Sequence, residues 1–163
     1  TSWFVPKPFT AFQWEPQITM EEYERRVKLL RQAITAKAVT YNWHDGDTSF
    51  LEAVLARGDR RLGKVLETVY RKGAKLDAWS DCFDLQRWLD AFQECGLDPA
   101  FYATRERSRD EVLPWSMISC HVSDSFLWRQ RELAHQSVTT PDCRTQCGGC
   151  GANQVEGGEC YHG

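Results

Sequence analysis

Four cysteines near the C-terminus have the residue type and spacing of a metal site. Cys147-Gly-Gly-Cys150-Gly151 is a Cys-x2-Cys-Gly turn, with Cys143 four residues before it and Cys160 ten residues after it. Two glycines between the thiols permit a tight turn in which both sulfurs reach one metal. Four thiolates suit tetrahedral zinc or an iron–sulfur cluster. The sequence therefore predicts a metal site at Cys143, Cys147, Cys150 and Cys160, and leaves the metal open.

A histidine beside carboxylates is a second candidate for chemistry. His44 is followed by Asp45 and, after a glycine, by Asp47. Such a group can shuttle protons, although Asp47 or Thr48 can equally be a helix cap. Cys120-His121 is a conceivable nucleophile–base pair, but neighbouring residues of an extended segment point to opposite faces.

A basic group is a third candidate, because clustered cations can bind phosphate or an RNA backbone. The alternative is that these side chains only cover the solvated start of a helix. The group consists of Arg57, Arg60, Arg61 and Lys64.

The elements that must position these residues are mostly helical. Residues 2–5 form an apolar run before Pro6 and predict a strand, and alternation at Val39, Tyr41 and Trp43 predicts another. Residues 115–122 are expected to be extended. Apolar residues at helical spacing predict helices beginning near Thr19, Asp47 or Thr48, Asp59, Asp84, Pro99 and Ser123. We therefore expect an α+β, mostly helical fold with a strand and loop over 1–18, a helical body over 19–136 and a cysteine-rich tail over 137–163.

Composition sets the limits of function. The chain has 163 residues, of which 42% are hydrophobic and 26% charged, and its net charge of −3 excludes a strongly basic surface overall. No apolar run approaches about 18 residues, and no export signal is recognisable, so we expect a cytoplasmic protein without membrane contact. The cysteines number seven, an odd count, and four of them cluster at the C-terminal end, which favours a reduced chain over a disulfide framework. The chain begins on Thr1 and an apolar segment, which indicates a piece of a longer protein.

Several longer motifs carry a resemblance to a known family. The sequence is similar, to about Gly151, to the C-terminal part of an uncharacterised radical S-adenosylmethionine (SAM) family, in which a cobalamin-binding-like region and a radical SAM barrel come first. The motifs that carry it are Phe4-Val-Pro-Lys-Pro8, Phe12-Gln-Trp14, Trp43-His-Asp45, Leu51-Glu-Ala-Val-Leu-Ala-Arg-Gly-Asp-Arg-Arg61 with Gly73, Leu97-Asp-Pro99, Leu113-Pro-Trp115 and Thr140-Pro-Asp-Cys143.

The resemblance implies an enzyme that cleaves SAM at a [4Fe–4S] cluster, with cobalamin as a further possible cofactor. The cluster and the SAM pocket would belong to the upstream barrel. This chain would supply the last strand or strands of that barrel, with Lys7 and Thr10 facing substrate or SAM, and an auxiliary iron–sulfur cluster or zinc in the tail. Cys160 would take the place of a family cysteine expected near Ala152. Alone, such a chain is expected to be inactive.

The residues also fit a second hypothesis from a different class. A small helical interaction module with a structural zinc knuckle would dock a protein or an RNA through its Trp- and Arg-bearing surface. The two hypotheses differ in the presence of an upstream barrel; an iron–sulfur cluster in the tail would support the enzyme, and zinc would move weight to the module.

Overall fold

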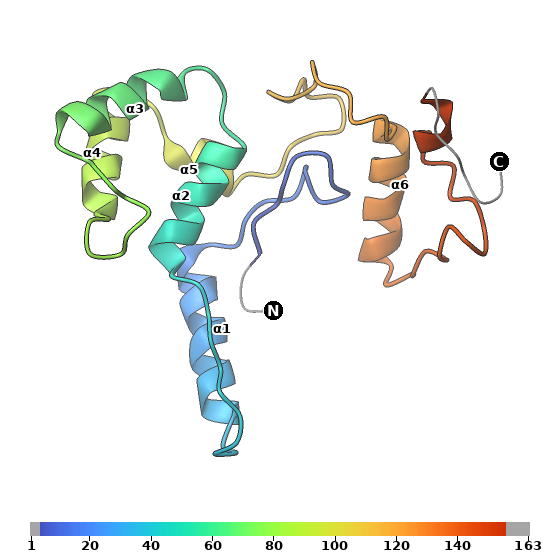
Figure 1. The fold of residues 1–163 in the computed structure, drawn as a ribbon, viewed down its shortest axis with the longest axis horizontal. Coiled ribbons are helices and arrows are strands. Elements are labelled where there is room, and N and C mark those ends of the chain that lie inside the picture. The colour runs from blue at the N-terminus through green and yellow to red at the C-terminus, as the bar shows by residue number, and fades with distance from the viewer. Residues whose placement is uncertain (1–3, 156–163) are drawn as a thin grey trace. The chain divides into compact units, whose positions relative to one another are not determined.

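The computed structural model describes residues 4–155 (Figure 1). These residues form six α-helices, α1 (Met20–Ala33), α2 (Gly46–Ala56), α3 (Leu62–Arg71), α4 (Leu85–Glu94), α5 (Pro99–Ala103) and α6 (Asp124–His135), and one 3-10 turn, η1 (Ala152–Gln154). None of residues 4–155 is in a β-strand. The prediction of an α+β fold that contributes strands to a barrel is therefore wrong for the part of the chain that the structure describes.

Among residues 4–155 the predicted strands do not form, because no segment pairs with them; residues 2 and 3 of the first one lie outside the described residues. Phe4 and Val5 are irregular, and the prolines at 6 and 8 carry no N–H to donate to a ladder. Val39 and Trp43 are exposed, at 55% and 43%, in a segment that returns along α1 without pairing. Residues 115–122, expected to be extended, instead begin with turns, in which the N–H of Ile118 donates to the carbonyl of Trp115 at 3.0 Å.

The predicted helices form, and all but α3 of the six have a local side-chain cap; α3 begins at Leu62, after Arg61, without one. The Thr19 hydroxyl accepts from the N–H of Glu22, and the hydroxyl of Ser123 accepts from the N–H of Phe126. The Asp84 carboxylate accepts from two N–H groups of the first turn of α4. The cap of α2 is Asp45, whose carboxylate accepts from the N–H of Thr48 at 2.9 Å, and not Asp47 or Thr48 as the sequence suggested. Each such cap satisfies a donor that the helix start would leave open.

The chain divides into two compact units, each with a core of its own. Unit 1 comprises 1–5 and 16–106, and its core lies between α2, α3, α4 and α5. Unit 2 comprises 6–15 and 107–163, and its core gathers Trp14, Leu113, Trp115 and Leu127. Residues 1–3 and 156–163 of these units lie outside the described part of the chain. Unit 2 is discontinuous in sequence, so an N-terminal loop and the cysteine tail belong to one unit.

Among residues 4–155, no helix has the length and apolar character needed to cross a membrane.

Candidate functional site

The Cys147–Gly151 turn has the backbone geometry of a metal-binding knuckle. The N–H of Gly149 points at the sulfur of Cys147 at 3.4 Å, and the N–H of Ala152 points at the sulfur of Cys150 at 3.5 Å. Hydrogen bonds from the backbone to sulfur are one of the means by which proteins hold and tune metal–thiolate groups. Gly149 and Gly151 have φ of +68° and +94°, a left-handed conformation that strains any residue with a Cβ. The two glycines therefore make the turn possible.

Helix α6 holds this knuckle from one side. The Arg129 guanidinium donates to the carbonyl of Gly148 and lies over the ring of Phe126. A Cβ at position 148 would come within 3.2 Å of that ring, so the glycine allows the close approach. At the start of the helix, the N–H of Ser123 donates to the carbonyl of Cys150 at 2.9 Å. The knuckle is thus anchored on a packed helix, whose Leu127 is buried.

The other predicted ligands are only partly placed by the structure. Cys143 lies exposed in a turn where the Asp142 carboxylate accepts from the N–H of Arg144 at 2.8 Å. Cys160 lies outside the described residues. Among residues 4–155, no three metal-ligating side chains converge on one point. The described part of the tail therefore places two thiols, Cys147 and Cys150, on one turn, and thiolate ligands suit zinc or an iron–sulfur cluster.

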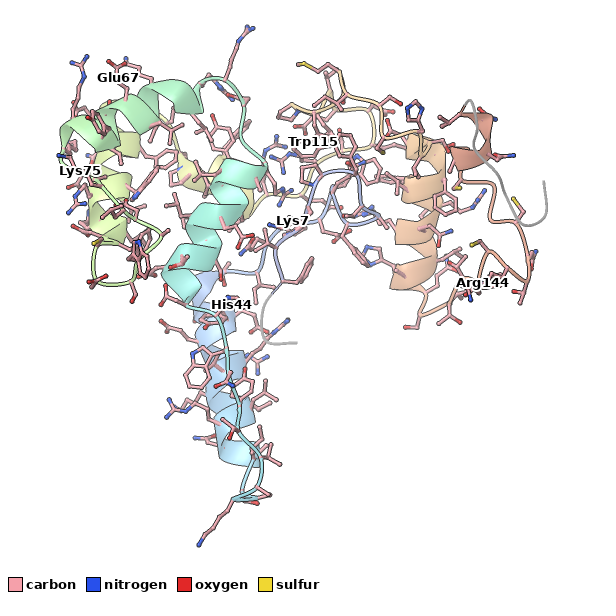
Figure 2. The ribbon with its side chains drawn as sticks, in the orientation of Figure 1. Lys7, His44, Glu67, Lys75, Trp115 and Arg144 are labelled. Atoms are coloured by element: carbon pink, nitrogen blue, oxygen red, sulfur yellow. The ribbon has the colours of Figure 1, made fainter. Side chains whose placement is uncertain are left out.

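Lys7 and Thr10 lie on a tight turn and not at the end of a strand. The Thr10 hydroxyl donates to the carbonyl of Lys7 at 2.8 Å, which closes the turn, while Lys7 is exposed (Figure 2). Phe9, between them, has φ of +58°, which is unusual for an aromatic residue. Thr10 therefore has a structural role. Of this pair, Lys7 is the residue that could contact SAM or a substrate.

Gln13 holds that turn, and sequence reasoning missed it. Its side chain is 1% exposed, and its Oε1 accepts from the N–H of Phe9 at 2.9 Å and from the indole N–H of Trp115 at 2.8 Å (Figure 2 labels Trp115). A buried amide that accepts two hydrogen bonds fixes the neighbours that donate them. The only sequence signal was its position between two aromatic residues, Phe12 and Trp14.

A cavity of about 230 Å³ adjoins this turn within unit 2. Phe9 and Trp115 line it together with the thiol-bearing Cys120 and the carboxylate-bearing Asp124, and the exposed Met117 lies at its edge. Its walls mix apolar and small polar groups. The cavity can hold a small organic molecule or several waters, and it brings together the N-terminal turn and the segment before α6.

A carboxylate in unit 2 binds an arginine and a histidine of α6. The Glu15 carboxylate accepts from the Arg131 guanidinium and lies 2.9 Å from His135 Nε2. Burial by itself would raise the pKa of Glu15, but the hydrogen bonds from His135 and Arg131 outweigh burial and hold this pKa below its ordinary value. Glu15 thus ties the N-terminal loop to the helix that carries the knuckle.

Other residues that the sequence marked as candidates for chemistry have structural roles within unit 1. Asp45 caps α2, the His44 carbonyl accepts from the Tyr23 hydroxyl, and the His44 side chain is exposed (Figure 2). Arg57 is fully buried and donates to the carbonyl of Ala103 at 2.9 Å, and Arg61 is paired with Asp59. Two of the four cations in the predicted basic patch are therefore committed to contacts within unit 1.

Cys120 and His121 lie beside the knuckle. A Cβ at position 151 would come within 3.6 Å of the His121 carbonyl, and His121 itself has φ of +61°. The pair is not part of a strand.

Comparison with protein-family models, with curated proteins and with solved structures finds no match to this chain.

Proposed function

We propose that this chain is the C-terminal portion of a radical SAM enzyme and that its tail holds an auxiliary metal group, an iron–sulfur cluster or a zinc ion. The observation that carries the proposal is the knuckle, in which backbone N–H groups point at the sulfurs of both Cys147 and Cys150. Backbone N–H groups directed at sulfur are typical of metal-bound thiolates, whose charge they stabilise.

Cys147 and Cys150 would provide two of the ligands, and Cys143 and Cys160 would complete the set. Metal binding would supply folding free energy that the short polar tail lacks. An iron–sulfur cluster would supply electron transfer or an iron that binds substrate. The SAM-binding [4Fe–4S] cluster, SAM and any cobalamin would belong to the upstream part of the enzyme.

Two of the motifs that carry the family resemblance contact each other, which supports the proposal. Gln13 of the Phe12-Gln-Trp14 motif accepts from Trp115 of the Leu113-Pro-Trp115 motif. Residues that make such long-range contacts hold the fold around a site and do not form the site themselves.

The test is metal analysis with visible absorption on protein purified without oxygen. The chain is compared with a Cys147→Ser/Cys150→Ser variant, and Cys82→Ser is the control, because Cys82 lies in unit 1. We expect iron with a broad charge-transfer band, or zinc, that the double variant loses and the control keeps. Chain that folds and holds no metal under these conditions would contradict the proposal.

A helical interaction module with a structural zinc knuckle is the second candidate. The observation that favours it is the separate core of unit 1, where helices α2 to α5 pack without any strand among the described residues. Zinc that is lost in the double variant, together with full helicity of unit 1 in both proteins, would favour this module over the enzyme. Iron in an oxygen-sensitive cluster would favour the enzyme.

A further inference from the structure

One segment of unit 1 has only basic residues among its charged side chains. The 20 residues from Arg25 to His44 contain five basic side chains and no acidic one. The whole chain has 20 basic and 23 acidic residues, so the segment carries a charge of +5 and the rest of the chain −8. The five cations are Arg25, Arg26, Lys28, Arg31 and Lys37. A locally positive region on an acidic chain attracts anions to that region in particular.

The segment folds into an arm with a groove along it. Helix α1 and the segment that follows it run side by side (Figure 1), and between them lies a groove of about 640 Å³. Tyr23 and Val27 contribute the buried side chains of the groove, and Trp43 comes from the returning segment. The polar lining consists of Glu24, Lys28, Arg31 and Gln32.

Three of the cations form no ion pair among the described residues, although the Glu24 carboxylate lines the same groove as Lys28 and Arg31. Arg25 and Arg26 form ion pairs with Glu22, which holds the pKa of Glu22 at about 2. Within the described residues, no ion pair engages Lys28, Arg31 or Lys37. All three are exposed. Such cations can exchange their counterions for phosphates at little cost.

An aromatic pair lies among these cations. Tyr41 and Trp43 are stacked, with ring centroids 5.2 Å apart, and the Arg31 guanidinium lies 5.2 Å from the Trp43 ring. The Trp43 side chain nevertheless remains 43% exposed. A groove that combines cations with exposed aromatic rings is how proteins hold single-stranded nucleic acid, since phosphates bind the cations and bases stack on the rings.

We propose that this arm binds single-stranded nucleic acid, with the phosphates at Lys28, Arg31 and Lys37 and an unpaired base against Trp43. An acidic peptide would satisfy the cations, but its carboxylates would gain nothing from the indole. A duplex would present phosphates, but its bases are already stacked. The proposal goes beyond the metal site, and neither depends on the other.

The test is fluorescence anisotropy of the full chain with a labelled oligouridylate of about twelve nucleotides, a length within the usual site size. We expect the logarithm of the binding constant to fall with the logarithm of salt concentration at a slope of about −2, since three cations each release about 0.7 counterions from a single strand. Lys28→Glu and Lys37→Glu should each weaken binding by about tenfold, while Lys75→Glu, an exposed control elsewhere in unit 1 (Figure 2), should not. Trp43→Ala should weaken binding of the oligouridylate, whereas Trp43→Phe should keep most of the affinity of the parent chain.

Circular dichroism must show that each variant keeps its helices. Absence of binding at low salt overturns the proposal, as does equal binding by the Lys28→Glu, Lys37→Glu and Lys75→Glu variants. Polyglutamate that competes as well as unlabelled oligouridylate at equal charge would identify an acidic-polypeptide surface instead and overturn it. Duplex RNA bound as tightly as the single strand would overturn the role of Trp43.

Discussion

Gly151 illustrates how single residues set the geometry of the candidate metal site. Its φ of +94° is a conformation that costs other residues about 1 kcal/mol or more. Gly151→Ala should therefore weaken metal binding by roughly fivefold or more. Metal competition with a chromophoric chelator measures this change. Gly63→Ala is the matched control, since a methyl group added at position 63 would meet nothing within 4 Å and α3 should tolerate it. Equal affinity in both variants would show that the knuckle is not the metal-binding conformation.

Glu15 gives unit 2 a defined dependence on pH. Its pKa is lower in the folded chain than its ordinary value of about 4.5. The native state therefore favours the ionised carboxylate, and the stabilisation is present above that ordinary value and is lost as the pH falls through the folded pKa. Glu15→Gln should lower the unfolding temperature at pH 6, and the difference from the parent chain should shrink toward pH 3. Glu67→Gln, on the exposed side of α3 (Figure 2), should show no comparable trend in thermal melts.

The start of helix α2 allows a test of which residue caps the helix. The Asp45 side chain accepts from the N–H and the hydroxyl of Thr48, whereas Asp47 is inside the helix. Asp45→Ala should lower the free energy of unfolding by about 1 kcal/mol. Asp47→Ala should change it by less than half of that, because burial and the nearby Asp45 already raise the pKa of Asp47. Urea unfolding of the two variants measures both values, and a larger loss for Asp47→Ala would contradict the assigned cap.

Helix α6 joins local and distant parts of unit 2. Its cap, Ser123, is local, but Arg131 binds Glu15, more than one hundred residues away in sequence. Arg129, two residues before it, binds the knuckle. The same helix therefore fixes both the N-terminal loop and the cysteine turn, which no periodicity within its own residues could indicate.

Unit 1 should fold by itself, and this is a prediction about the whole molecule. Its core cluster draws on residues 51–103, with Val5 only packed against it. A fragment spanning Pro16–Glu106 should keep its helical circular dichroism and unfold cooperatively in urea. A gradual loss of signal without a sigmoidal transition would mean that the core needs unit 2.

The sequence by itself determined the features that depend only on neighbouring residues. Caps at Thr19, Asp84 and Ser123 act over three residues, so their helices could be predicted from the residues next to them. The Cys147–Gly151 turn is local in the same way, since its glycines and its N–H···S bonds lie within a few neighbouring positions. The metal at this turn stays a prediction.

Only the tertiary structure decided the outcome for the strands and the buried polar residues. A strand is stabilised by hydrogen bonds to a partner that is distant in sequence, and the alternation at Val39, Tyr41 and Trp43 carries no information about whether that partner exists. The same holds for Gln13 and Arg57. Their hydrogen-bond partners, Trp115 and Ala103, lie 102 and 46 residues away. Long-range contacts of this kind set the framework of both units, because burial leaves a polar group no partner other than the one that folding brings to it.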